Sequence, residues 1–146
     1  GPTGRRAEGG MNILVVSNLY PPDFLGGYEL GCRQMADALR AAGHRVTVLT
    51  AAPRTPVPPQ PGVLRRLKLT DVYDPYSQLR NRMVTHALKY TEAHGLHAFN
   101  VGQFADTLRE VDPDVVYFWN LIGLGGVGLV AAAQFLGYPW VMHIMD

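Results

Sequence analysis

The sequence predicts an α/β fold in which helices cover both faces of a parallel sheet. Short apolar runs alternate with longer segments whose apolar residues recur at steps of three and four, which is typical of successive β-α-β units. The runs are apolar at consecutive positions, as in Ile13-Leu14-Val15-Val16. Strands with this pattern are buried on both faces, as they are in parallel sheets. The predicted architecture is therefore Rossmann-like.

The first β-α-β unit is the clearest part of this pattern. A strand is predicted at 12–17, a helix with one apolar stripe follows and ends at Gly43, and a second strand is predicted at 45–50. The members of the stripe are three or four residues apart: Tyr28, Cys32, Met35, Leu39 and Ala42.

Further elements follow a proline-rich loop at 53–61, which cannot be regular structure because each proline removes a hydrogen-bond donor. Asp74-Pro75 is typical of a helix start, and Gly95 and Asp112-Pro113 are expected to end the two middle helices. The expected elements are a short strand within 63–73, helices at 74–94 and 98–111, a strand at 114–119, a helix at 126–136, and a buried terminal strand at 139–146 that no helix follows.

Composition narrows the class of protein. The length of 146 residues predicts one domain, and a formal net charge of +1 argues against a nucleic-acid partner. The single cysteine, Cys32, excludes an internal disulfide and a cysteine-rich zinc site, which favours a reducing cytoplasm. No apolar run is long enough to span a bilayer. Residues 1–10 are interpreted as a disordered cloning remnant, outside the domain at 11–146.

Ligands of parallel sheets bind beyond the carboxyl ends of the strands, where the loops at 18–29 and after Trp119 and the tail at 143–146 should meet. Gly26-Gly27 precedes the first helix, so backbone N–H groups and the positive end of the helix dipole could receive a phosphate there. The alternative is that these glycines only let the chain turn, and that Glu29 only complements the dipole.

The first loop and its surroundings resemble a known family. The residues that carry the resemblance are Pro21-Pro22, Gly26-Gly27-Tyr28-Glu29, the helix end from Leu39 to His44 and the strand Val46-Thr47-Val48-Leu49-Thr50. They are similar to the start of the retaining GT-B glycosyltransferases of family four, also called glycosyl transferases group 1. The resemblance implies the acceptor-side N-terminal half of a GT-B fold, with the C-terminal donor domain absent and this truncated chain inactive.

The same resemblance implies a hexosyltransferase-type reaction that moves a sugar, with retention, from a nucleotide diphosphate sugar to an acceptor without a metal or other cofactor. Gly26, Gly27 and Glu29 would lie at the donor phosphates. His143 is the catalytic candidate, because the family carries a histidine in a similar His-Asp stretch, although here Asp146 follows two residues later than an adjacent partner would. Asn18, Asn120 and Asp146 are the candidates for binding the acceptor or the sugar.

Each of these candidates has a structural alternative. A histidine inside an apolar strand is commonly a core residue, and an asparagine at a strand end is commonly a turn former. Three other histidines, His86, His94 and His97, lack a completing carboxylate or cysteine, so we expect no metal site.

A rival motif predicts a different class of protein. Gly123, Gly125 and Gly128 satisfy G-x-G-x-x-G between a strand and a helix, and Asp146 lies near the place of an acidic ribose partner. This alternative is a non-catalytic nucleotide- or dinucleotide-binding module. Against it, residues 120–122 separate the strand from the first glycine, and the motif falls late in the chain.

A short basic stretch allows one further partner. Arg65, Arg66 and Lys68 could attract an acidic acceptor or the anionic inner face of a membrane, which would make a cytoplasmic protein peripheral there. The alternative is an ordinary solvated face.

Overall fold

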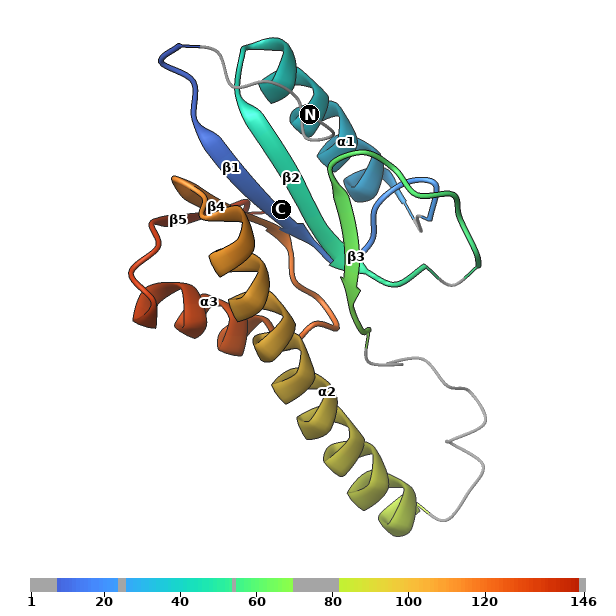
Figure 1. Cartoon of the computed structure of the whole chain (residues 1–146). Helices are drawn as coiled ribbons and strands as arrows, with labels where there is room; N and C mark the ends of the chain where they lie inside the picture. The colour runs from blue at the N-terminus through green and yellow to red at the C-terminus, as the bar shows by residue number, and fades with distance from the viewer. Residues whose placement is uncertain (1–7, 24–25, 54, 70–81, 145–146) are drawn as a thin grey trace.

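The computed structural model describes residues 8–23, 26–53, 55–69 and 82–144, with the backbone alone for residues 82–93. A five-stranded parallel sheet in the order β3-β2-β1-β4-β5 forms its centre (Figure 1). The strands are β1 (Asn12–Ser17), β2 (Arg45–Ala51), β3 (Val63–Leu67), β4 (Val115–Asn120) and β5 (Trp140–Met142), and the helices are α1 (Gly27–Ala41), α2 (Arg82–Val111) and α3 (Gly126–Phe135). The predicted Rossmann-like α/β fold is confirmed.

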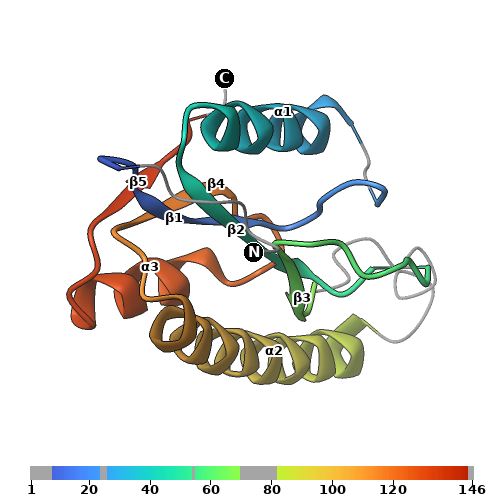
Figure 2. The ribbon, with the colours of Figure 1, turned by 45° about the horizontal axis from the view of Figure 1, so that its top comes forward.

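The helices cover the two faces of the sheet unequally. Figure 2 shows α1 on one face and α2 and α3 together on the other. Successive side chains of β1 point to opposite faces of the sheet. Ile13 and Val15 pack in the cluster on the α1 side. Leu14 and Val16 pack in the cluster that also contains buried residues of α2 and α3. Burial on both faces explains why the strand is apolar throughout.

The two middle helices predicted from the sequence are one helix. α2 continues through Gly95 to Val111, so the predicted break at Gly95 is wrong. Glycine keeps its backbone donor and acceptor, so it weakens a helix by about 1 kcal/mol without interrupting the hydrogen-bond ladder. The following turns of α2 offset this cost by burying Asn100, Phe104 and Leu108. The predicted start at Asp74-Pro75 lies outside the described residues.

The terminal strand is shorter and more exposed than predicted. β5 covers only Trp140–Met142, and these residues are 37%, 47% and 44% exposed, so the prediction of a buried strand over 139–146 is wrong. β5 lies at the edge of the described sheet and pairs there with β4. At the other end of the chain, Glu8 and Gly9 form a turn, and residues 1–7 lie outside the described residues.

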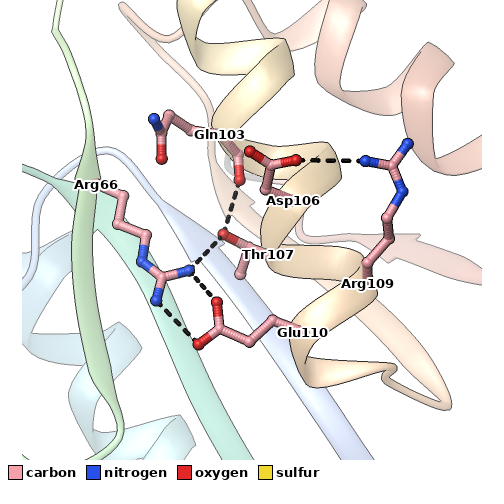
Figure 3. Close-up of polar contacts among 6 residues, drawn as sticks. All are labelled: Arg66, Gln103, Asp106, Thr107, Arg109 and Glu110. Carbon is pink, nitrogen blue, oxygen red and sulfur yellow. Dashed lines mark hydrogen bonds and ion pairs between the residues drawn. The ribbon is translucent and has the colours of Figure 1, made fainter.

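Side chains attach α2 to the edge strand β3. The Arg66 guanidinium donates to both carboxylate oxygens of Glu110, at 2.6 and 3.0 Å, and to the Thr107 hydroxyl at 3.2 Å (Figure 3). This hydrogen bonding lowers the pKa of Glu110. Farther along α2, the buried Asn100 side chain accepts from the Lys68 N–H and donates to the carbonyls of Lys68 and Leu124. Asn100 thus joins α2 to both β3 and the loop before α3.

Glycine-to-alanine substitutions test the continuity of α2. A Cβ at Gly95 meets nothing within 4 Å, so Gly95→Ala should raise the free energy of unfolding by about 0.5–1 kcal/mol. Gly128→Ala in α3 should lower it, because its Cβ would lie 2.9 Å from Val101 Cγ2. Urea denaturation measures both changes. A helix that ended at Gly95 would instead be destabilised by Gly95→Ala.

Candidate functional site

The carboxyl ends of β1 and β4 are joined through two asparagines. The Asn18 N–H donates to the Asn120 carbonyl at 2.8 Å, and Asn18 Nδ2 donates to the Ile122 carbonyl at 3.1 Å. Asn18 Oδ1 accepts from the Leu19 N–H, and Asn120 Oδ1 accepts from the Ile122 N–H. These side chains, predicted to bind a sugar or acceptor, therefore lie together and hold the loops that border the site.

His143 lies at the same edge, directly after β5. Its N–H donates to the Phe118 carbonyl at 2.8 Å, which continues the pairing with β4. Its imidazole stacks on the Trp119 indole, with ring centroids 4.0 Å apart and planes 9° from parallel. The residue is half-buried rather than enclosed in the core. Asp146, its predicted companion, lies outside the described residues.

The loop before α1 holds an internal cap. Glu29 Oε2 accepts from the Gly26 N–H at 3.0 Å, and Glu29 is only 5% exposed. This bond at the helix start satisfies a backbone donor that would otherwise lack a partner within the helix. The Glu29 carboxylate thus serves the helix N-terminus directly, as its structural alternative proposed.

Neither glycine of this loop is required by the described fold. Gly26 has an extended backbone, with a φ of −168°, and Gly27 is not among the glycines with positive φ. A Cβ added at either position would meet no described atom within 4 Å. Both residues are exposed, so none of the described residues covers the backbone at the start of α1.

The glycines of the rival motif are explained by the fold itself. Gly123 and Gly125 have φ values of 81° and 75°, a region that favours glycine. A Cβ at Gly125 would lie 2.6 Å from the ring of His97, and the Cβ of Gly128 would press on Val101. Left-handed turns and close packing of α3 on α2 therefore account for the pattern, and His97 of α2 packs against Gly125.

Arg65 anchors the loop after β1 from the edge strand β3. Its guanidinium donates to the carbonyls of Tyr20 and Pro21, at 3.2 and 2.9 Å, and to Gln60 Oε1. Burial lowers the pKa of Arg65, while Asp23 and Tyr20 act in the opposite direction. Because its contacts are to loop carbonyls more than 40 residues away, no local sequence signal distinguishes Arg65 from its neighbours.

The interpretation of the basic stretch as an ordinary solvated face is therefore wrong for Arg65. Arg66 is paired with Glu110, and the Lys68 ammonium lies 4.2 Å from the centroid of the Phe99 ring. Each of the three cations thus has a partner within the chain.

A cavity of about 890 Å³ opens beside His143, between β4, β5 and α3. Its walls are mainly apolar side chains, and its polar lining comes from Asn120, Gln134 and His143. Trp140 Nε1 donates to Gln134 Oε1 at 3.1 Å, so that amide also has a partner within the fold. Asn120, Gln134 and His143 thus bring polar groups to a cavity that apolar side chains otherwise line.

Comparison with known proteins identifies the family. Residues 26–146 match the glycosyl transferase 4-like domain. The match covers the helices α1 to α3 and the strands β2 to β5. The chain belongs to the glycosyl transferase 4-like family. The predicted family is thereby confirmed, on a match that includes Gly26-Gly27-Tyr28-Glu29 and begins after Pro21-Pro22.

The chain is also similar to a bacterial protein of greater length. An uncharacterized 42.6 kDa protein in the cps region of Klebsiella pneumoniae is 27% identical over 126 residues, which cover 78% of this chain and 31% of that protein. The glycosyl transferase 4-like chain thus spans about a third of the length of this relative.

Among the residues that the structure describes, no three His, Cys, Asp or Glu side chains are grouped so that they could hold a metal ion. No helix in the described part of the chain combines the length and apolar character needed to cross a bilayer.

Cys32 is a residue of α1 and is fully buried. Burial raises the pKa of its thiol to about 12, with the nearby Ser17 side chain acting in the opposite direction. A protonated, enclosed thiol is a poor nucleophile. Cys32 is therefore a core residue, as predicted from its place on the apolar stripe.

Replacing the Arg65 anchor should weaken the domain. Arg65→Ala would remove donors from the Tyr20 and Pro21 carbonyls, which belong to buried residues, and should cost about 1–3 kcal/mol in the free energy of unfolding. Arg109→Ala is the matched control, since Arg109 pairs with Asp106 in an exposed contact and should matter little. Equal urea midpoints for the two variants would contradict the anchoring role.

The Cys32 thiol should resist labelling while the protein is folded. With a pKa of about 12, only about one thiol in ten thousand is ionised at pH 8, so Ellman's reagent should react only after unfolding in urea. The raised pKa also has a stability consequence. The protonated Cys32 thiol contributes fully to the free energy of unfolding below the ordinary thiol pKa of about 8.5, and this contribution is lost as the pH rises toward 12. Rapid labelling of native protein at pH 8 would contradict the assignment.

Proposed function

We propose that this chain is the acceptor-side domain of a retaining glycosyltransferase of hexosyltransferase type, which takes its sugar from a nucleotide diphosphate donor. A second domain of the same polypeptide would supply most of the donor site. Family membership supports sugar transfer. The single observation that carries the proposal to a site is the open backbone at Gly26 and Gly27, which the described fold leaves unexplained.

The two glycines are suited to a diphosphate. The first N–H groups of a helix lack partners within the helix, and the helix dipole favours negative charge at this end. With no side chain at Gly26 or Gly27, a phosphate could approach the backbone closely. In the reaction, the departing diphosphate gains negative charge, and donors already in place would stabilise it electrostatically.

Glu29 explains why this chain by itself should bind the donor weakly. Its carboxylate already lies at the N-terminus of α1 and accepts from Gly26. A full negative charge there exceeds the half positive charge of the helix dipole, so a phosphate needs further cations. We therefore propose that basic residues of the second domain complete the phosphate site, and that the chain alone transfers no sugar.

His143 is the proposed catalytic residue. Its half-buried imidazole, after the edge strand, could hydrogen-bond a sugar hydroxyl or stabilise charge at the reacting carbon. Asn18 and Asn120 hold the loop backbone at the same edge. We propose that these two asparagines and Asp146 also contact the sugar or the acceptor. No metal or other cofactor is required by this scheme.

The cellular location of the protein and the position of its acceptor are further parts of the proposal. The single cysteine favours the cytoplasm, where a peripheral contact with the inner face of the membrane would give access to a membrane-borne acceptor. The intramolecular partners of Arg65, Arg66 and Lys68 reduce the attraction that this stretch can offer to anionic lipids. We propose no nucleic-acid partner.

Gly27→Ala tests the phosphate site. The methyl group of the alanine would project from the backbone at the helix start, where the phosphate is proposed to bind. We therefore expect kcat/KM of the full-length enzyme to fall about 10- to 100-fold. The fold should not suffer, because alanine is the better helix former. Gly102→Ala in α2 is the matched control, since its Cβ also meets nothing within 4 Å and it lies outside the site. Two variants with the same kcat/KM would contradict the proposal.

The chain by itself gives a second test. Calorimetry with uridine, guanosine and adenosine diphosphate sugars should detect no micromolar binding, because Glu29 occupies the helix N-terminus. Micromolar affinity for one of them would show that the site is complete in these 146 residues. Binding of a dinucleotide in their place would favour the rival module.

A further inference from the structure

Trp119 makes three separate contacts at the carboxyl end of β4. One face of its indole stacks on the His143 imidazole at 4.0 Å. Its Nε1–H donates to the Tyr28 carbonyl in the first turn of α1, at 2.8 Å. Its Cζ2 lies 3.4 Å from the place of a Cβ on Gly31, so the six-membered ring lies directly against the α1 backbone.

These contacts place one rigid side chain between two parts of the edge that the sequence separates widely. Tyr28 follows Gly27 directly, and His143 lies more than a hundred residues later. The indole is only 9% exposed, and it packs with the α1-side cluster that includes Cys32. A flat ring with two rotatable bonds transmits position well, because little conformational freedom is left to it once it is buried.

We infer that Trp119 is a positioning residue, which sets where the His143 imidazole lies relative to the glycine loop at the start of α1. The role of His143 and of the glycine loop in sugar transfer rests on the function proposed above. The contacts that join them through Trp119 do not depend on that function. If the donor diphosphate lies at Gly26-Gly27 and its sugar reaches His143, the indole determines whether both are engaged together, and misplacement of about 1 Å can cost a hundredfold in rate.

The geometry is more specific than core filling. A tryptophan that only filled volume would need neither a parallel stack nor a partner for its N–H on the helix that carries the glycine loop. Tyr117, on the same strand face, lies at a centroid distance of 6.1 Å from Trp119 with a tilted ring, which is an ordinary packing contact. The stack on His143 is closer, and its ring planes are nearly parallel.

Nuclear magnetic resonance of this chain tests the link without any assay of transfer. In the stack, the ring current of the indole shifts the His143 ring protons upfield. Trp119→Leu should abolish that shift and also move the amide signals of Gly26, Gly27 and Tyr28. Trp119→Phe should keep the His143 signature, because a phenyl ring can still stack, while moving the Tyr28 signal through loss of the indole hydrogen bond.

Trp140→Phe is the matched control. Trp140 is the other tryptophan of the chain, is 37% exposed and bonds to Gln134 rather than to α1 or His143. It also assigns the Trp119 indole N–H signal by elimination. In the reverse direction, His143→Ala should shift this indole signal and the Tyr28 amide in a protein that stays folded, which keeps the test valid even where Trp119→Leu unfolds.

Kinetics of the gene-encoded enzyme then separate the two proposals. Trp119→Leu should lower kcat about 10- to 100-fold with KM changed less than about threefold, and Trp119→Phe should fall between this variant and the unsubstituted enzyme. If His143→Ala leaves the Trp119 and Tyr28 signals unchanged, the positioning role is overturned whatever the activity. If these signals move together but no nucleotide sugar is turned over, the positioning stands and the proposed function fails.

Discussion

Parallel pairing of β1 with both β2 and β4 is the interaction on which the rest of the structure depends. Val15 pairs with Val48 on one side and with Tyr117 on the other, so the central strand is enclosed within the sheet. Its side chains alternate between the two cores, and a slip of one residue would exchange every contact between the layers. Because all five strands run in the same direction, their loops gather at one edge.

Four described polar side chains at that edge hold the loops in place. Asn18 and Asn120 hold the backbone after β1 and β4, Glu29 caps α1, and Arg65 anchors the carbonyls of Tyr20 and Pro21. A buried carbonyl or N–H without a partner costs about 1–3 kcal/mol, so irregular loops in this position need such partners. The proposed donor contacts among the described residues are the exposed backbone at the start of α1 and the imidazole of His143.

The two groups of glycines show how one residue type serves two purposes. In the loop before α3, left-handed backbone angles favour glycine at Gly123 and Gly125, and within α3 a close contact with Val101 of α2 accounts for Gly128. Before α1, neither backbone strain nor crowding by a described residue requires glycine at Gly26 or Gly27. A sequence pattern cannot distinguish the two groups of glycines. In this chain, backbone angles and packing explain the G-x-G-x-x-G motif but not Gly26-Gly27. Glycines that the fold does not need are the stronger indication of a ligand.

The sequence by itself determined the α/β class, the existence of the strands, and the family, because buried parallel strands and the Gly-Gly-Tyr-Glu loop are local patterns. It also predicted that the loops after β1, β4 and β5 meet, since parallel strands share one carboxyl edge. Tertiary structure alone decided that α2 runs through Gly95, that β5 is an exposed edge, that Arg65 anchors a loop and that Trp119 stacks on His143. These outcomes depend on partners distant in the chain, whose packing and hydrogen bonds outweigh the local preferences that a sequence pattern records.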